Sequence, residues 1–544
     1  MRTSIHGCSL FNNMCRRQPS SASANATRLP CQITSELRQQ FALRIGDASN
    51  ALNDASQRLL DAFVDTIFTL SHQPLRPTEG NFAPVEEIGG KREICDVAGE
   101  IPADFPEGVY IRNGSNPLFG ALHSSTSIFG KSHDIWVEGE GMLHAVYFTK
   151  SNNNTWSIKY TNRYVQSDTF RAEKGLKKPC FIPASDGDPL AMLIAGTLNT
   201  LRFGKAFKNM SNTSVFEHAG RVFSAAENDN PHEIDLYSLD TLGSWNVDGG
   251  WKMPFTAHPK VIPGTGELVI FGFNLDAPFL TVGVISGFTK LQQKVALKLD
   301  RCTYCHEIGV TTMYNIILDA PLTISKERML KGGPLIEFEK DSYARIGVMP
   351  RYGDANSITW FYVQSFCTIH LVNCFEEDDE TELENKDNCR QILNSRRGCL
   401  EFPIINGKYV GLPHKYAYAQ VADSLANLGW SGIIRPKFGG FAKFCLDEKE
   451  DATTKNKGTE DLIMVKYHHL ERNQFCSGAT FVPKANGTNE DDGWIISFVH
   501  DEGTDKSEVH IINTQTFEYE PIAKITLPQR VPYGFHGAFV SKST

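Results

Sequence analysis

From about residue 80 to its end, the sequence alternates short apolar segments with turns. Residues 156–160 (Trp-Ser-Ile-Lys-Tyr) and 508–511 (Glu-Val-His-Ile) alternate apolar and polar side chains, which is typical of strands with one buried face. Residues 268–273 (Leu-Val-Ile-Phe-Gly-Phe) are almost wholly apolar, as in a strand buried on both faces. The 44 glycines and 26 prolines of the chain can supply the turns between such strands. The pattern predicts an all-β fold.

Two segments share a pattern that is typical of repeated hairpins. Residues 236–242 and 511–517 each read as a strand, a polar turn with a late threonine, and a return strand. Repeated hairpins of this kind build the blades of a β-propeller. A chain of 544 residues often has three or four domains, but one large all-β domain is an allowed exception. Polar stretches at 376–389 and 447–461 are expected to be surface insertions.

Residues 1–40 differ in composition from the rest of the chain. Four arginines and no acidic residue precede Glu36, and the segment has no apolar core of the kind that a secretory signal needs. This composition suits an organellar transit peptide, and a disordered tail is the equal alternative.

Residues 41–75 are predicted to hold an amphipathic helix, over approximately 51–70. Its apolar side chains fall on one face at helical spacing; they are Leu52, Leu59, Phe63, Val64 and Ile67. We interpret the helix as packed on the surface of the domain. The alternative is peripheral membrane contact, in which the helix lies on a membrane and collects a lipophilic substrate. No apolar run reaches the roughly 18–20 residues that a membrane-spanning helix needs.

Charge and cysteine content limit the classes of function. The formal net charge of −9 argues against nucleic acid as a partner, because phosphate binding needs a basic face. Of the 13 cysteines, only Cys302 and Cys305 form a C-x-x-C pair, and we expect the cysteines to be reduced and mostly buried. These two cysteines and His306 offer three ligands to a zinc or redox site, for which no fourth ligand is near.

Four of the 16 histidines lie beside predicted strands. His258 precedes a turn and a buried strand, His306 precedes a β-branched run, His370 follows an apolar run, and His536 lies near the end of the chain. They are too far apart in sequence to form a helical metal motif, so only the tertiary fold could bring them together. The residues alone leave a shared metal site as a hypothesis.

Several further segments carry a resemblance. They are residues 108–114 (Gly-Val-Tyr-Ile-Arg-Asn-Gly), 139–144 (Gly-Glu-Gly-Met-Leu-His), 256–260 (Thr-Ala-His-Pro-Lys), 401–406 (Glu-Phe-Pro-Ile-Ile-Asn), 491–493 (Asp-Asp-Gly) and 530–537 (Arg-Val-Pro-Tyr-Gly-Phe-His-Gly). With these segments in this order, the chain from about residue 80 onward resembles a divergent member of the plant carotenoid cleavage dioxygenase family.

The resemblance implies a fold and a metal site. It implies that residues 76–544 form a seven-bladed β-propeller with iron on its axis, and with a helical and loop cap over a substrate tunnel. One Fe(2+) per chain would be held by four histidines, which match His258, His306, His370 and His536. Two glutamates that orient such ligands in the family match Glu227 and Glu401.

The resemblance also implies a reaction. Four neutral imidazoles leave ferrous iron with a dipositive centre and open positions for dioxygen. The family adds both oxygen atoms of O2 across a conjugated C=C bond, which gives two carbonyl products. No flavin or nicotinamide fingerprint is present. We expect a lipophilic carotenoid or apocarotenoid substrate, cleavage at the 9,10 bond, and a location in the plastid rather than the cytoplasm.

Two alternative functions stay open. One is dioxygenase action on another conjugated alkene, such as a stilbene or phenylpropanoid. The other is a propeller that binds an isoprenoid with weak or no turnover. Departures near His306, where Glu307 replaces the common Asp, motivate the first alternative, and Gly478, which stands where a third glutamate is usual, motivates the second. A further departure is Glu138-Gly139-Glu140, where the family has an acidic Gly-Asp-Gly segment. A lost carboxylate partner typically costs about 10–100-fold in metal affinity or activity, so Gly478 predicts weak activity or a water in the gap.

Overall fold

The computed structural model describes residues 57–72, 79–153, 155–376, 400–423, 436–449 and 463–542. The predicted N-terminal tail (1–40) and most of the two predicted surface insertions (376–389 and 447–461) lie outside the described residues. The chain divides into two units, residues 1–63 and 64–544. The fold described below is that of the second unit.

The predicted N-terminal helix is present over residues 57–67; residues 51–56 lie outside the described part. The prediction is wrong at the far end, where Thr69–His72 forms strand β1. This strand pairs antiparallel with β5 (His123–Ser127), so its backbone groups bond to a neighbouring strand instead of continuing the helix. Val64 and Phe68 at the junction are buried. None of the described helices is long and apolar enough to cross a membrane.

The unit is mostly β, as the sequence predicted. Three four-stranded antiparallel sheets follow one another along the chain. They are β10 (Ser214–His218), β11 (Arg221–Ala225), β12 (His232–Ile234) and β13 (Thr241–Ser244); β14 (Lys260–Val261), β15 (Leu268–Phe273), β16 (Leu280–Ile285) and β17 (Leu291–Ala296); and β18 (Gly309–Val310), β19 (Tyr314–Asp319), β22 (Ala344–Pro350) and β23 (Thr359–Val363). A short hairpin, β20 (Leu322–Ile324) with β21 (Ile336–Phe338), branches from the third sheet.

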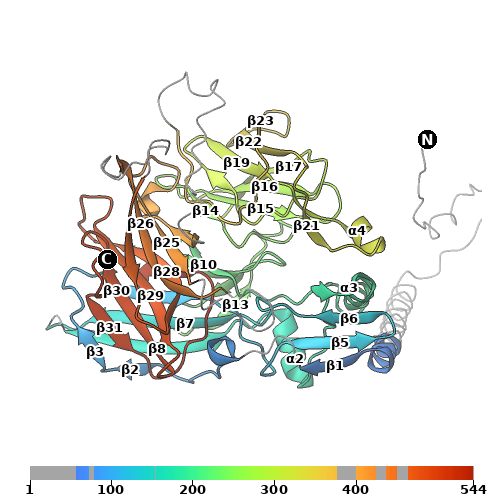
Figure 1. Ribbon diagram of the computed structural model, residues 1–544, viewed down its shortest axis with the longest axis horizontal. Helices are drawn as coiled ribbons and strands as arrows, with labels where there is room; N and C mark the ends of the chain where they lie inside the picture. The colour runs from blue at the N-terminus through green and yellow to red at the C-terminus, as the bar shows by residue number, and fades with distance from the viewer. Residues whose placement is uncertain are drawn as a thin grey trace, which may run out of the picture. The chain divides into compact units, whose positions relative to one another are not determined.

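Two larger sheets contain strands from both ends of the chain. The first has the order β2-β8-β7-β4-β32, and the second runs from β24 to β31 and ends with β3. In Figure 1 the last strands, in red, accordingly return beside the first ones, in blue. The strands are β2 (Arg92–Ile94), β3 (Val97–Gly99), β4 (Gly108–Arg112), β7 (Met142–Lys150), β8 (Trp156–Tyr164), β24 (Leu400–Ile404), β25 (Tyr416–Ala422), β26 (Phe438–Lys449), β27 (Ile463–His469), β28 (Gln474–Pro483), β29 (Gly493–Asp501), β30 (Lys506–Asn513), β31 (Ala523–Thr526) and β32 (Gly537–Ser541).

A small sheet with order β1-β5-β6-β9 accompanies the helices. Its remaining strands are β6 (Gly130–His133) and β9 (Asp186–Gly187), and the helices are α2 (Asp168–Leu176), α3 (Pro189–Phe203) and α4 (Lys326–Leu330). Helix α3 packs against β6 and β9. It begins with proline, whose fixed φ suits the first helical position, and ends before Gly204, whose φ of +73° is the left-handed C-terminal cap.

The strand predictions are largely confirmed, with shifts at the turns. Residues 268–273 form β15, which is buried on both faces. In β30, by contrast, His510 is buried between its apolar neighbours, because its Nε2 pairs with Glu508 Oε2 at 2.8 Å. Both predicted hairpins exist, as β12–β13 and β30–β31, but residues 236–240 form the turn rather than a strand.

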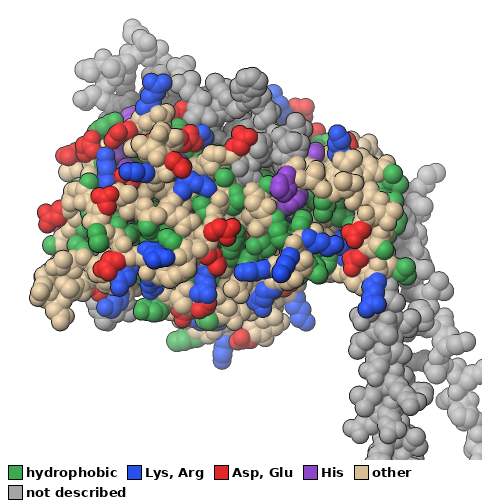
Figure 2. Space-filling model, turned by 90° about the horizontal axis from the view of Figure 1, so that it is seen from below, with side chains coloured by type: hydrophobic (Ala, Val, Ile, Leu, Met, Phe, Trp, Pro, Cys, Tyr) green, Lys and Arg blue, Asp and Glu red, His purple; other side chains and the backbone are tan. Residues whose placement is uncertain are grey.

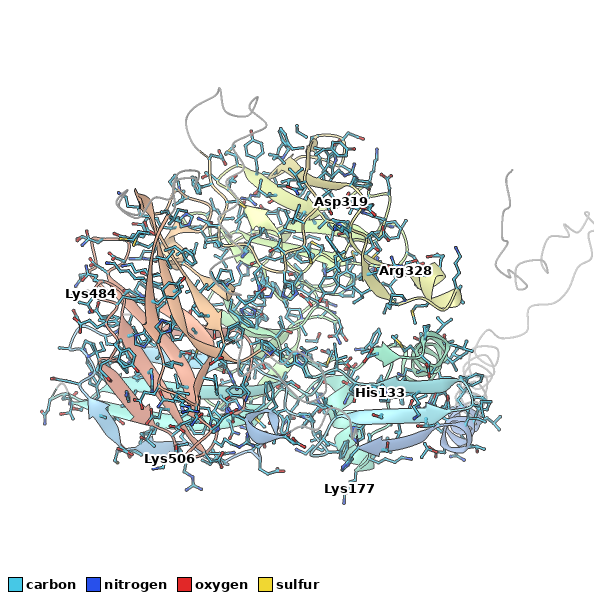
Figure 3. All side chains as sticks on the ribbon, viewed as in Figure 1. His133, Lys177, Asp319, Arg328, Lys484 and Lys506 are labelled. Carbon is cyan, nitrogen blue, oxygen red and sulfur yellow. The ribbon has the colours of Figure 1, made fainter. Side chains whose placement is uncertain are left out.

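Side chains fill the spaces between the sheets (Figure 3). Phe105 illustrates the packing: its ring lies 5.1–5.6 Å from the rings of Phe148, Trp494 and Phe539, on three different strands. Burying one such side chain contributes about 1.5–3 kcal/mol. Some buried charged groups form ion pairs, as at Asp319 (labelled in Figure 3), whose carboxylate accepts from Nε of Arg301 and of Arg345. On the face shown in Figure 2, acidic and basic side chains are interspersed.

Candidate metal centre

The four predicted histidines lie on loops next to strand ends. Three of them precede the first strand of a sheet or its edge: His258 comes just before β14, His306 just before β18, and His536 directly before β32. His370 follows β23, on the connection that leads to β24. Loops that enter neighbouring sheets can therefore bring together residues that are far apart in sequence.

The fold brings all four imidazoles into one cluster, the four-histidine cluster. One ring nitrogen from each lies within 4.8 Å of the others. Nε2 of His306 is 2.9 Å from Nε2 of His258 and 3.3 Å from Nε2 of His370. The ring centroid of His536 lies 4.4 Å from that of His258 and 5.0 Å from that of His370. The nitrogen atoms of separate loops thus face one common point.

Two carboxylates lie behind the cluster, at the positions that the resemblance indicated. Nδ1 of His370 is 2.7 Å from Oε2 of Glu401 on β24, and Nδ1 of His306 forms an ion pair with Oε1 of Glu227. A carboxylate accepts a hydrogen bond and has none to donate when ionised, so each Nδ1 carries the proton. Nε2 of both rings is then left with a free lone pair towards the centre of the cluster.

Electrostatics favour neutral rings at two of the four positions. Burial, reinforced by the neighbouring histidines, lowers the pKa of His258 and of His536 well below the usual value. Burial also acts to lower the pKa of His306, but the carboxylates of Glu227, Glu307 and Glu401 together outweigh it, so the pKa is raised. A metal ligand must be an unprotonated imidazole nitrogen, so His258 and His536 are ready for coordination at neutral pH.

The donor set fits a divalent transition metal. Imidazole nitrogens suit iron, zinc, copper and nickel, whereas magnesium and calcium prefer oxygen ligands. Glu227 and Glu401 supply two negative charges, which balance the two positive charges of such an ion. Within the part of the chain that the structure describes, this is the one group of His, Cys, Asp and Glu side chains close enough to hold a metal.

Gly478, where a third glutamate was expected, leaves no empty gap. Its φ is +70°, and a Cβ built on it would lie 2.2 Å from Cγ of Arg112. The stem of Arg112 occupies this space, and its Nη1 donates to the carbonyl oxygen of Pro532 at 2.5 Å and to Oγ of Ser477 at 3.1 Å. The expected gap is therefore filled by protein. Arg112 also lies against Gly534, two residues before His536.

An aromatic pocket, which the sequence did not predict, adjoins the cluster. Its aromatic lining is Phe82, Trp136, Phe402, Phe438 and Tyr533. The ring of Phe402 lies 4.9 Å from that of His536 and 5.4 Å from that of His370, so Phe402 stands between the pocket and these two histidines. Phe402 follows Glu401, but nothing in the local sequence distinguishes it from an ordinary core residue.

The cysteine pair does not take part in the cluster. Cys302 and Cys305 are buried and free, and their sulfurs donate to backbone oxygens of Asn274 and Glu307. Of the eight described cysteines, five are buried, and all eight are free, as predicted.

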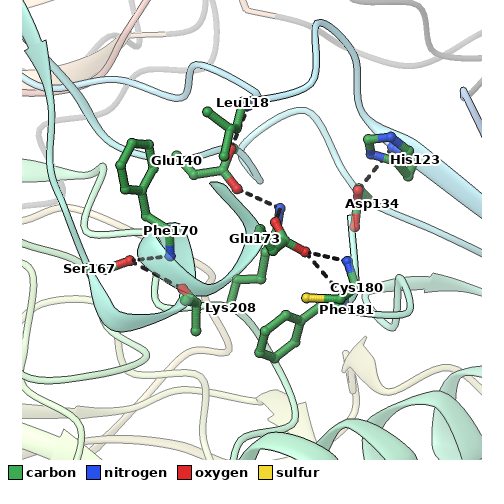
Figure 4. Close-up of polar contacts among 12 residues, drawn as sticks. Leu118, His123, Asp134, Glu140, Ser167, Phe170, Glu173, Cys180, Phe181 and Lys208 are labelled. Atoms are coloured by element: carbon green, nitrogen blue, oxygen red, sulfur yellow. Dashed lines mark hydrogen bonds and ion pairs between the residues drawn. The ribbon is translucent and has the colours of Figure 1, made fainter. Parts of the chain in front are cut away.

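A second buried charged cluster includes the departure at Glu140, with Asp134, Glu173 and Lys208 (Figure 4), and Glu138 lies near Asp134 and Lys208. Nζ of Lys208 binds Oε1 of Glu140 at 2.7 Å and lies 3.5 Å from Oε2 of Glu173. Burial and the nearby Asp134 raise the pKa of Glu138 to about 8. Its carboxyl group accepts from the backbone N–H of Ile135 at 2.7 Å and from Oγ of Ser185. These bonds fix the loop that carries Trp136 to the aromatic pocket.

Comparison with known proteins decides the family. The family model described as "Retinal pigment epithelial membrane protein" matches residues 82–391 and 379–541. The chain is 31% identical over 540 residues to carotenoid 9,10(9',10')-cleavage dioxygenase 1 of Pisum sativum, and the match covers 91% of this chain and 95% of that protein. The chain belongs to the carotenoid cleavage dioxygenase family.

Further relatives and solved structures agree with this family assignment. A probable carotenoid cleavage dioxygenase 4 of Arabidopsis thaliana, named chloroplastic, is 27% identical, and the match covers 98% of this chain and 91% of that protein. Among solved structures, a lignostilbene dioxygenase from Pseudomonas brassicacearum superposes with a TM-score of 0.67 at 22% identity, covering 86% of this chain and 98% of that one. Cobalt-substituted apocarotenoid oxygenase from Synechocystis has a TM-score of 0.64 at 22% identity, covering 84% and 96%. The solved structures support the fold, and the curated relatives confirm the predicted enzyme class, a dioxygenase.

Proposed function

We propose that this chain is a non-haem Fe(2+) dioxygenase that cleaves a conjugated C=C bond of a carotenoid or apocarotenoid. The observation that carries the proposal is the convergence of His258, His306, His370 and His536 beside an aromatic pocket, in a chain of this family. The four histidines would hold one iron ion per chain, and the names of the curated relatives favour the 9,10 (9',10') bond.

The chain's own residues have separate tasks in this reaction. Bound ferrous iron would supply the dioxygen chemistry. Glu227 and Glu401 hold the Nδ1 protons of His306 and His370, which keeps both Nε2 atoms directed at the metal. The aromatic side chains of the pocket would pack against one part of a flat conjugated chain, since aromatic faces and edges pack well against π-systems. The alkene and one O2 molecule give two carbonyl products, so no external reductant is needed.

The proposal also covers the fold, a closed seven-bladed propeller, and the location of the protein in the plastid. The sheets follow one another along the chain, and β32 and β3 join strands of its two ends, which is how a seven-bladed propeller with iron on its axis would close. Several relatives are named chloroplastic, which favours the plastid. For the helix at residues 57–67, membrane contact that collects a lipophilic substrate stays the alternative to packing on the domain surface, and the exposed Leu59 and Phe63 agree with this alternative.

Metal analysis and isotope labelling test this function. The purified protein should contain about one iron per chain and convert an apocarotenoid under ¹⁸O2 into two labelled carbonyl products. His306→Ala should lose both properties, whereas His218→Ala, a buried histidine bonded to the Ser286 carbonyl oxygen, should keep them. Label that comes from water alone, before exchange, would contradict the mechanism. Turnover of a stilbene but of no carotenoid would assign the alternative substrate class, and tight binding without turnover would assign a binding protein.

A further inference from the structure

Glu307 directly follows the predicted ligand His306, and its carboxylate reaches two other loops of the four-histidine cluster. Oε1 accepts a hydrogen bond from Nζ of Lys260, two residues after His258. Oε2 accepts from the backbone N–H of Leu371, the residue after His370, at 2.5 Å. One side chain therefore joins the loops of three of the four histidines.

The setting of Glu307 makes these contacts strong. Its side chain is 5% exposed and that of Lys260 is 22% exposed, so water competes little for either charge. Hydrogen bonds with one or two ionised partners are about twice as strong as neutral ones. The N–H of Leu371 needs an acceptor, because a backbone donor that is shielded from water and left unpaired destabilises the fold. Both oxygens of the carboxylate are thus in use.

We propose that Glu307 is a positioning residue that holds three histidine loops at the spacing the metal requires. The inference rests on the proposed metal site. The charges of Glu307 and Lys260 cancel, so the two carboxylates behind the cluster remain free to balance the metal. The fourth loop is held separately: the N–H of His536 donates to the Thr213 carbonyl oxygen, and its own carbonyl oxygen accepts from the N–H of Asn113, both at 3.2 Å.

Two variants separate the effect of the length of the Glu307 side chain from the effect of its charge. Glu307→Gln keeps the length of the side chain but leaves Lys260 without its counter-charge. Glu307→Asp keeps the charge but is one methylene shorter, so it cannot contact both Lys260 and Leu371. If positioning is the role, both variants weaken metal binding by about 10–100-fold, the range for lost partners of metal ligands.

A matched control removes a buried ion pair elsewhere. Nζ of Lys443 lies 2.7 Å from Oδ2 of Asp491, and their side chains are 2% and 12% exposed. Of the described residues, no histidine of the cluster contacts this pair. Asp491→Asn should therefore lower the melting temperature of the metal-free protein without changing its affinity for metal.

The readout is titration of each metal-free protein with Co²⁺, followed by its visible absorption, together with the melting temperature before metal is added. The proposal expects the affinity for Co²⁺ to fall in both Glu307 variants and to stay at the wild-type value in Asp491→Asn. Wild-type affinity in folded Glu307→Asp, or an equal loss in Asp491→Asn, would overturn the positioning role alone. A wild-type protein that binds no metal would overturn the proposed function and this role with it.

Discussion

Replacing Gly478 with alanine tests whether Arg112 fills the space of the missing glutamate. Gly478 has a φ of +70°, and an added Cβ would lie 2.2 Å from Cγ and 2.4 Å from Cδ of Arg112. Arg112 cannot move away easily, because its guanidinium is buried against Gly534 and bonded to Pro532. The new methyl group therefore meets a fixed neighbour.

Two costs add at this position. A left-handed backbone costs an alanine about 1–2 kcal/mol relative to glycine, and overpacking a fixed interior costs about 1–3 kcal/mol more. We expect Gly478→Ala to lower the free energy of unfolding by about 2–5 kcal/mol. For a domain of this size, 1 kcal/mol corresponds to about 1 °C in melting temperature.

Gly220 supplies a matched control, because its φ is +73° and nothing lies within 4 Å of a Cβ built on it. Gly220→Ala should show the backbone cost alone, and differential scanning calorimetry of both variants gives the packing cost by difference. Equal losses of stability would refute the conclusion that Arg112 fills the space. On the same reasoning, Gly478→Glu should not raise activity, since its side chain must first displace Arg112; a gain in activity would contradict this account.

Three further predictions concern charge. Glu401→Gln should reduce metal affinity by about 10–100-fold, measured by metal titration, because Nδ1 of His370 loses its charged acceptor; an unchanged affinity would remove Glu401 from the site. The pKa of Glu138 is raised to about 8, because the folded protein holds the proton of this carboxyl group more tightly than the unfolded chain does. This stabilisation is lost as the pH rises from about 4.5 to 8, at about 1.4 kcal/mol per pH unit. Glu138→Gln should therefore stabilise the protein more at pH 8 than at pH 5 in urea unfolding, and an equal effect at both would refute the shift. The pKa values of His258 and His536 are lowered, whereas that of His306 is raised. As the pH falls below about 6.5, the unfolded chain takes up protons that the two buried rings refuse, and protonation of His306 offsets this only in part. The metal-free His306→Ala variant should therefore lose stability between pH 7 and 5, and constant stability over this range would contradict the two lowered pKa values.

Local sequence patterns predicted the strands better than their ends. The apolar segment at residues 268–273 forms β15 as expected, because a short apolar segment next to a turn is compatible with few structures other than a buried strand. The helix predicted to Leu70 stops earlier, because pairing of β1 with β5 is a long-range contact that periodicity does not contain. In β30, His510 is buried by its pairing with Glu508, which overrides the alternation of the sequence.

For the candidate site too, the sequence predicted some features and missed others. The resemblance predicted four histidines and the glutamates at 227 and 401, and the fold places all six together. The partners of Glu307 could not be predicted, because Lys260 and Leu371 belong to separate loops. The aromatic pocket was also missed, since its five aromatic residues come from five segments of the chain.

The absence of a carboxylate at Gly478 has a narrower consequence than the sequence suggested. A carboxylate behind a ligating imidazole both fixes the orientation of the ring and raises its basicity. Gly478 lies against Gly537, the residue after His536, so His536 is the ligand that lacks a carboxylate here. The orientation of its ring has other sources: its backbone is bonded to Thr213 and Asn113, Phe402 lies against its ring, and Arg112 braces the preceding turn through Pro532. Basicity has no such substitute, because the nearest replacement for the glutamate is a cation. His536 should therefore be a correctly placed but weaker donor, so the metal should bind with normal stoichiometry and reduced affinity rather than be lost.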